Sequence, residues 1–469
     1  MSESTDTSPA TSEEPVVSNR KQPFPQGFLS TISTGWAERA ETIAPPRIEA
    51  AYAAARRVAL SALFPGSRLV IPAGELKQRS NDTDYPFRAH SAFAHLTGWG
   101  ADSEPGSVLV FEPRADEGHD VMLYFRERAD RTTSEFYADA SVGEFWIGPR
   151  PSLAQVAADL AIATAHLDAF TPSEADRVVD EDAELSRIVS ELRLIKDEHE
   201  IAQLQLAVDV TGAGFDDIVR ELPRIVAHPR GERVVEGVFH QRARSDGNWE
   251  GYDTIAASGA HACYLHWTRN DGRVLPGDLI LIDAGVEVDS LYTADVTRTL
   301  PVNGRFTEVQ RRVYETVREA ADVAFAAARP GVKFREIHEA AMSVIAARVA
   351  EWGLIPVTAE EALDADRGGQ HRRYMVHGTS HHLGLDVHDC AQARRDMYYE
   401  GELAPGMVFT IEPGLYFQAD DLTVPEELRG IGVRIEDDIL MTAEGPVNLS
   451  AGIPRTADEI EAWIARLSS

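Results

Sequence analysis

Four carboxylates interrupt apolar, strand-like segments in the C-terminal half of the chain. Asp283 lies in LILIDAG, Asp295 in YTADVTRTL, Glu412 in VFTIEPGLY and Glu436 in GIGVRIEDDILM. A carboxylate inside a core is costly unless it is paired, hydrogen-bonded or bound to a metal ion. For one such aspartate a turn or a satisfied hydrogen bond explains the residue best, but four together favour a shared cation.

Arg434 belongs to the same pattern. Side chains alternate along a strand, so Arg434 and Glu436 point toward the same face. Such a pair usually lies on a solvated face. The three other strand carboxylates favour a buried site instead.

Histidines cluster in the segment MVHGTSHHLGLDVHD, which contains His377, His381, His382 and His388. Adjacent side chains point in different directions, so at most one of His381 and His382 faces a given site. A lone histidine is usually structural. With four in one glycine-containing loop, a functional site is as good an explanation as a structural one.

The charges of these residues suggest which ions they could bind. A site built from one histidine and four carboxylates carries −4, which two divalent cations balance; its members are Asp283, Asp295, His381, Glu412 and Glu436. Oxygen ligands with a single nitrogen favour Mn2+, with Co2+, Fe2+ or Zn2+ as alternatives. Two such ions side by side are typical of hydrolysis.

Composition narrows the class of protein. The chain has 469 residues, enough for two or three domains. Its net charge of −31 opposes binding to nucleic acid or to an anionic membrane surface. Two cysteines and a polar, acidic N-terminus without a signal-peptide pattern predict a cytoplasmic protein.

Hydrophobic periodicity predicts a tail and two domains. Residues 1–24 are expected to be a disordered acidic tail and 25–187 an α/β domain. Residues 188–469 are expected to form an α+β domain with an antiparallel sheet covered by helices. Helices are predicted over 43–64, 153–165 and 184–207, and capping boxes at Thr307 and Thr456.

Six blocks of sequence resemble the pita-bread metallopeptidase family. They are LHWTRND (265–271), LIDAG (281–285), ADVTRT (294–299), HGTSHHLGLDVHD (377–389), TIEPGLY (410–416) and GVRIEDDI (432–439). Within that family they are most similar to the aminopeptidase P branch. NDTDYPFRAHSAFAHLTGW (81–99) and ELRLIKDEHEIAQL (191–204) are similar to the N-terminal domain and linker helix of that branch.

The resemblance implies a curved antiparallel pita-bread sheet and a role for each matching residue. Asp295 and Glu436 would bridge two metal ions, Asp283 would bind one ion, and His381 with Glu412 the other. Glu412 would also take a proton from the metal-bridging water, whose hydroxide attacks the scissile carbonyl. His266, His377 and His388 would line the substrate site, and Arg434 with Tyr416 would help to position substrate and ligands.

The implied activity is release of the N-terminal residue from peptides with proline in second position, by a homodimer or homotetramer. Two alternatives remain: a prolidase that cleaves Xaa-Pro dipeptides, and a non-catalytic binding protein on the same scaffold. The chain also departs from the family twice. The interval from Asp283 to Asp295 is one residue longer, which predicts a β-bulge. Ala94 and His95 replace bulky aromatic residues in a segment that, in the family, can contribute to a neighbouring subunit's substrate pocket.

Overall fold

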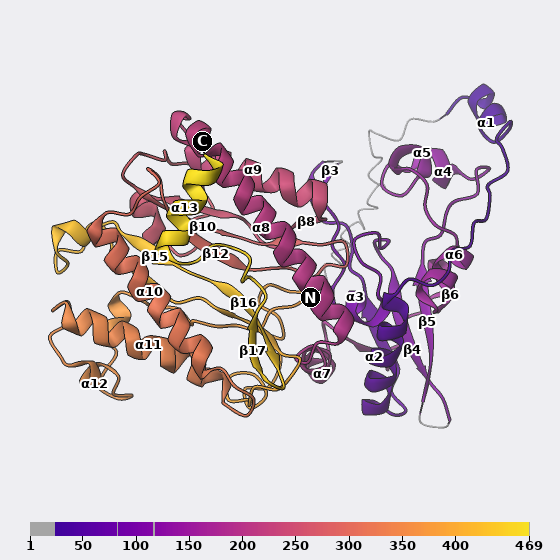
Figure 1. The fold of residues 1–469 in the computed structure, drawn as a ribbon. Coiled ribbons are helices and arrows are strands. Elements are labelled where there is room, and N and C mark those ends of the chain that lie inside the picture. The colour runs from indigo at the N-terminus through magenta and orange to yellow at the C-terminus, as the bar shows by residue number, and fades with distance from the viewer. Residues whose placement is uncertain (1–23, 82, 116–117, 469) are drawn as a thin grey trace, which may run out of the picture.

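The computed structural model describes residues 24–81, 83–115 and 118–468. Figure 1 shows two lobes, with the N-terminal lobe in indigo to magenta and the larger C-terminal lobe in magenta to yellow. The expected disordered tail, 1–24, lies outside the described residues except for Phe24. None of the described helices is both long and apolar enough to cross a membrane.

The N-terminal lobe contains a mixed five-stranded sheet in the order β6-β5-β4-β1-β7. Its strands are β1 (Leu69–Pro72), β4 (Val108–Pro113), β5 (His119–Phe125), β6 (Ala163–His166) and β7 (Arg177–Val178). The helices are α1 (Gln26–Ile32), α2 (Glu49–Leu63), α3 (Ser91–Thr97), α4 (Ser134–Ala138), α5 (Glu144–Ile147) and α6 (Leu153–Leu160). A small hairpin pairs β2 (Gln78–Ser80) with β3 (Thr83–Asp84).

The C-terminal lobe is built from short antiparallel sheets. Their strands are β8 (Trp249–Glu250), β9 (Ile255–Ser258), β10 (Leu279–Ala284), β11 (Val286–Glu287), β12 (Val296–Pro301), β13 (Val408–Ile411), β14 (Gly414–Tyr416), β15 (Gly432–Arg434), β16 (Asp437–Thr442) and β17 (Gly445–Asn448). Every ladder in this lobe is antiparallel. The expected order of an α/β lobe followed by an α+β lobe is confirmed.

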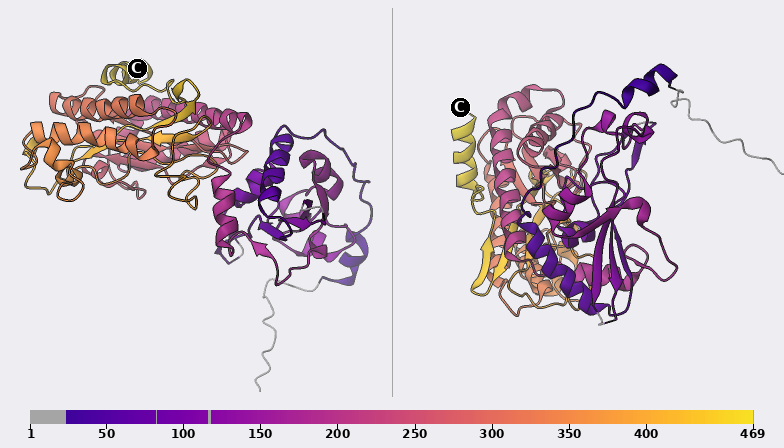
Figure 2. Two further views of the ribbon diagram at one scale, coloured as in Figure 1. Left: turned by 90° about the horizontal axis from the view of Figure 1, so that it is seen from below. Right: turned by 90° about the vertical axis from the view of Figure 1, so that its right-hand side faces the viewer.

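Helices cover one side of these sheets, as the view from below in Figure 2 shows. They are α8 (Glu198–Ala227), α9 (Gly231–Asp246), α10 (Glu308–Ala327), α11 (Phe334–Glu351) and α13 (Ala457–Leu467), with the short α12 (Ala359–Ala362) at the periphery. The capping boxes predicted at Thr307 and Thr456 are confirmed at the starts of α10 and α13.

Three helix predictions need correction. The helix expected over 43–64 begins at Glu49, after Pro45 and Pro46, which disfavour helical backbone before them. The helix expected over 153–165 ends at Leu160, where Ala161 turns left-handed and leads into β6.

The long helix expected over 184–207 is two helices, α7 (Ala183–Glu191) and α8. Asp197 starts α8 with a capping box, in which its carboxylate accepts from the N–H of Glu200 and the Glu200 carboxylate accepts from the N–H of Asp197.

Two large clusters of buried apolar side chains stabilise the molecule. One fills the space between the helices and sheets of the C-terminal lobe. The other is continuous across the two lobes, joining residues such as Leu69 and Phe93 to Tyr292 and Leu383. The histidine-rich segment therefore lies against an apolar boundary between the lobes.

Candidate metal centre

Five segments of the chain, each carrying one residue, bring the predicted ligands together. Asp283 lies near the end of β10, where it pairs with Thr297 of β12, and Asp295 immediately precedes β12. An isolated bridge joins Thr297 to Glu436, so Glu436 lies beside the same pair of strands. The N–H of Glu412 donates to Thr379 O at 2.8 Å, which places Glu412 beside the segment that carries His381.

The five side chains line one cavity of about 700 Å³. His266, His377, His388 and Arg434 line it too. Tyr416 lies just behind the wall and reaches it through its hydroxyl, which is 2.8 Å from His377 Nε2 and 3.3 Å from Arg434 Nη1. The cavity thus collects the five predicted ligands and the three histidines predicted to line the substrate site, with Tyr416 in contact from behind.

Donor atoms of Asp295, His381 and Glu436 lie within 4.8 Å of one another, close enough to share an ion. His381 Nε2 is 3.3 Å from Asp295 Oδ2 and 3.7 Å from Glu412 Oε1. Asp283 accepts a hydrogen bond from Arg434, and Glu436 accepts one of 2.7 Å from Thr297 Oγ1. The expectation that Arg434 and Glu436 share a face is confirmed, because both bond to Thr297 Oγ1, and both are buried.

Burial makes the negative charges of this site unfavourable in the protein alone. Burial raises the pKa of Glu412 to about 8, and the charges of Asp295 and Asp283 add to the shift. Burial and neighbouring carboxylates raise the pKa of Glu436 well above its usual value, and burial raises the pKa of Asp283. Carboxylates held this way, with a histidine among them, have the donor chemistry of a divalent metal site.

His381 responds in the opposite direction. Although burial lowers its pKa, the hydrogen bond to Asp295 and the charge of Glu412 outweigh burial and raise the pKa to about 9. In the metal-free protein the protonated imidazole therefore supplies a positive charge among the carboxylates. Its neighbour His382 points elsewhere, as expected, and is buried against Phe334 with ring centroids 4.5 Å apart.

Comparisons with known proteins agree with this geometry. The model of metallopeptidase family M24 matches residues 202–443, and that of the aminopeptidase P N-terminal domain matches residues 52–184. The chain belongs to metallopeptidase family M24. As a member it is a hydrolase, a metallo-aminopeptidase that uses divalent metal, with an α/β N-terminal domain and a pita-bread catalytic domain.

Relatives match nearly the whole chain. It is 52% identical to Xaa-Pro aminopeptidase 2 of Streptomyces coelicolor, covering 96% of this chain and 100% of the relative. It is 50% identical to Xaa-Pro aminopeptidase 1 of the same organism, covering 98% and 96%. A solved structure of Escherichia coli aminopeptidase P, in a low-pH form, superposes with a TM-score of 0.77 at 31% identity, covering 90% of this chain and 99% of that one.

Three polar residues of this M24 site were given no role from the sequence. The hydroxyl of Tyr252 lies 2.7 Å from Asp283 Oδ1 and 2.5 Å from Asp295 Oδ1, so it spans two predicted ligands. Thr297 supports Glu436, and the buried Asp438 accepts from the N–H of Asp295 at 3.1 Å. Thr297 and Asp438 lie inside the quoted blocks ADVTRT and GVRIEDDI, but Tyr252 lies in none of them.

The structure describes both places where the sequence was expected to depart from the family pattern. The ladder between β10 and β12 runs without a register shift, so the expected β-bulge is wrong. In the connection before β12, Leu291 adopts a left-handed φ of 69°. Ala94 and His95 are both buried in α3, and His95 Nε2 lies 3.4 Å from Glu200. These two side chains therefore face the interior of their own chain.

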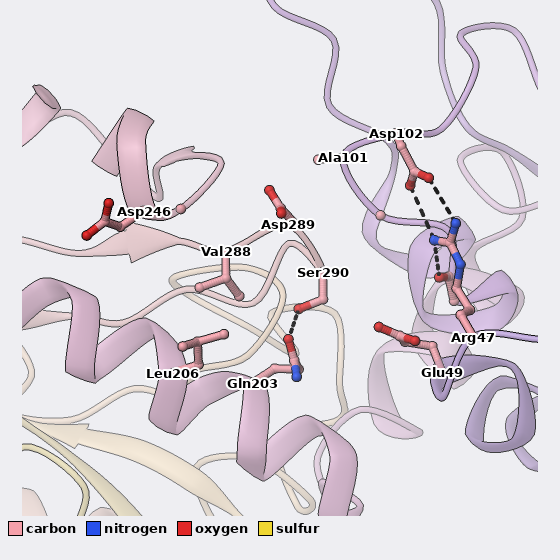
Figure 3. A pocket seen from close by; sticks show the side chains of 13 residues that line it. Arg47, Glu49, Ala101, Asp102, Gln203, Leu206, Asp246, Val288, Asp289 and Ser290 are labelled. Carbon is pink, nitrogen blue, oxygen red and sulfur yellow. Dashed lines mark hydrogen bonds and ion pairs between the residues drawn. The ribbon is translucent and has the colours of Figure 1, made fainter. Parts of the chain in front are cut away.

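A second cavity, of about 590 Å³, lies between the lobes (Figure 3). Its acidic side chains are Glu49, Asp102, Asp246 and Asp289. Arg47 is already paired with Asp102 at 2.9 Å and with Asp159. No described histidine or cysteine lines this cavity, which distinguishes it from the candidate metal centre.

Proposed function

We propose that this M24 enzyme is an Xaa-Pro aminopeptidase, which releases the N-terminal residue from peptides with proline in second position. The observation that carries the proposal is the convergence of three buried carboxylates, the half-buried Glu412 and His381 in one cavity. The names of relatives that match almost its whole length support the same activity. A site shaped for a pyrrolidine ring selects the X–Pro bond, which lacks an N–H.

Two divalent ions are the proposed cofactors, most simply Mn2+, with Co2+, Fe2+ or Zn2+ as alternatives. Asp295 and Glu436 would serve as ligands of both ions, Asp283 of one ion, and His381 with Glu412 of the other. When bound, such ions polarise a carbonyl and lower the pKa of water. The raised pKa values of the metal-free carboxylates support this assignment, because bound cations would relieve their repulsion.

The remaining side chains are assigned to substrate and proton transfer. Glu412 Oε accepts a proton from the attacking water and returns it to the leaving amine. His388 is exposed at the cavity, with its ring centroid 4.4 Å from that of His381, and it donates to the developing oxyanion. His266 and His377 orient the substrate. The chain from Arg434 through the Tyr416 hydroxyl to His377 holds that histidine in place.

A prolidase remains the nearest alternative, and the charges lining the cavity argue against it. Capture of a dipeptide requires a cation for its free carboxylate. Among the described residues that line the cavity, the only lysine or arginine is Arg434. Its guanidinium already donates to Asp283, Tyr416 and Thr297. A longer peptide, whose carboxylate lies outside, fits this lining better.

We also propose the domain limits 25–187 and 188–469, a tail over 1–24, a cytoplasmic location and a homodimer or homotetramer. Two buried, unpaired cysteines are consistent with a reducing compartment. The strong negative charge supports peptide substrates rather than nucleic acid or membrane partners.

The decisive experiment compares two substrates by mass spectrometry. The purified, Mn2+-loaded chain is given an Xaa-Pro-Xaa peptide and an Xaa-Pro dipeptide in parallel, with and without chelator. Chelator-sensitive release of one residue from the longer peptide is expected. Cleavage of the dipeptide alone would make the protein a prolidase. If the chain retains two ions but cleaves neither substrate, the result would favour a non-catalytic binding protein.

A further inference from the structure

The loop 258–272 carries His266 to the cavity. Leu265 and Thr268 of the same loop also line the cavity. The His266 side chain is exposed and makes no hydrogen bond to any described residue. Its location therefore depends on how the backbone of the loop is held from behind.

One buried carboxylate holds that loop. Glu232 lies in the first turn of α9, and none of it is exposed to solvent. Its Oε1 accepts from the N–H of Ser258 at 2.8 Å and from His261 Nδ1 at 2.7 Å. Its Oε2 accepts from Trp267 Nε1 at 3.0 Å and from the N–H of Gly272 at 2.6 Å. All four bonds go to the loop, which uses the full capacity of a carboxylate.

The contact to Trp267 bears directly on His266, because the two residues are adjacent in the chain. The Trp267 indole stacks on the His261 ring, with centroids 3.9 Å apart and an interplanar angle of 27°. Both rings donate to Glu232, so the carboxylate and the two rings form one unit. At Gly272 an added Cβ would lie 2.7 Å from Glu232 Oε2, so the loop closes tightly on the carboxylate.

We propose that Glu232 is a positioning residue, which fixes His266 in the substrate site through its four hydrogen bonds to the loop 258–272. Glu232 does not line the cavity and contacts none of the predicted metal ligands. It therefore reaches the substrate site only through this loop, in which His266 is the cavity-lining residue adjacent to Trp267. The inference rests on the proposed function, because it assigns a route by which His266 serves that activity.

A double-mutant cycle tests this route in the Mn2+-loaded full chain. Glu232→Gln keeps the shape of the side chain but turns an amide N–H₂ toward two of the four donors. It is expected to lower kcat/KM on an Xaa-Pro-Xaa peptide on the order of 10- to 100-fold, while the metal content stays at the wild-type value. In a His266→Ala background the same change is expected to lower kcat/KM by less than about threefold.

Glu236→Gln is the matched control. Glu236 lies one turn further along α9 and accepts from Asn270 Nδ2 at 3.0 Å. In this variant Asn270 still donates to Thr254 O at 2.8 Å and still accepts from the N–H of Ala256 at 2.9 Å. The loop therefore stays anchored. Wild-type kcat/KM is expected. If Glu232→Gln does not fold, Trp267→Phe removes one of the four bonds, keeps the ring, and is expected to show the same dependence on His266.

Two results would overturn the proposal. One is an equal loss from Glu232→Gln with His266 present or absent, which indicates general destabilisation. The other is unchanged activity in both backgrounds. Failure of the proposed function gives a different result, because the wild-type chain then releases no residue from the Xaa-Pro-Xaa peptide. Hydrogen exchange over 262–271 decides the inference in that case: it must rise in Glu232→Gln and stay unchanged in Glu236→Gln.

Discussion

The ammonium nitrogen of Lys196 lies 3.2 Å from Oδ2 of Asp389, and both side chains are almost completely buried. Arg193 Nε donates to Oδ1 of the same carboxylate at 2.9 Å. Lys196 and Arg193 lie between α7 and α8, whereas Asp389 directly follows His388. The ion pairs of Asp389 with Lys196 and Arg193 therefore connect the histidine-rich segment to the chain between the two lobes.

Replacing Lys196 by methionine is expected to lower the free energy of unfolding by about 3–5 kcal/mol, because Asp389 would remain buried with one cation instead of two. The pKa of Asp389 supports this. Although burial raises it, Arg193 and Lys196 outweigh burial and hold it at about 2, so the carboxylate is ionised at neutral pH. Urea unfolding followed by tryptophan fluorescence measures the change.

The control is Arg367→Gln. Arg367 pairs with Asp364 at 3.3 Å, but its side chain is 87% exposed. Removing this exposed pair should change the free energy of unfolding by less than about 1 kcal/mol. Similar small losses in both variants would contradict a structural role for the Lys196–Asp389 pair.

Replacing Tyr252 by phenylalanine is expected to weaken metal binding about 10- to 100-fold. Its hydroxyl bonds to both Asp283 and Asp295, and the variant loses this direct link between the two carboxylates. Competition with a chelator of known affinity measures the loss. Tyr264→Phe is the control, since Tyr264 is exposed and does not line the cavity. Equal affinities in the two variants would contradict the role given to Tyr252.

The acidic residues of the site could be found in the sequence because a carboxylate in an apolar strand carries an energetic cost. Asp283 and Glu436 stand out among isoleucine and leucine, and the structure brings them together. Tyr252 gave no such signal, because a tyrosine in a polar connection is ordinary. Its place between Asp283 and Asp295 depends on long-range packing that no local pattern records.

The errors in the fold have similar causes. Apolar spacing over 184–207 continues through the break at residues 192–197, so it predicted one helix. The capping box of Asp197 and Glu200 was a local signal for the start of α8 that the apolar pattern concealed. The β-bulge failed as a prediction because the register between β10 and β12 is continuous over the whole ladder.

Metal binding is expected to release protons, and its apparent affinity should rise between pH 6 and about pH 9. In the metal-free protein the pKa of Glu412 is raised to about 8 and that of His381 to about 9. A raised pKa means that each group holds its proton at pH 7 and must lose it to become a ligand. Near pH 7 uptake should therefore release at least two protons, those of Glu412 and His381, and near pH 10 these two groups should release almost none.

Calorimetric titration with Mn2+ in buffers of different ionisation enthalpy measures this number of protons. The Glu412→Gln variant is the internal comparison, because it has one titrating ligand fewer and should release about one proton fewer at pH 7. Proton release that does not change between pH 7 and pH 10 would contradict the assignment of Glu412 and His381 as ligands.

Glu412→Gln should also lower kcat on an Xaa-Pro-Xaa peptide by roughly 10²- to 10⁴-fold, because an amide cannot accept the proton of the attacking water. Glu444→Gln, in the exposed turn between β16 and β17, provides the control and should keep wild-type kcat. The assay must be run at saturating Mn2+ with metal content measured in parallel. A lower kcat that recovers fully with added Mn2+ would make Glu412 a ligand only, whereas a loss that persists at full metal occupancy identifies it as the proton acceptor.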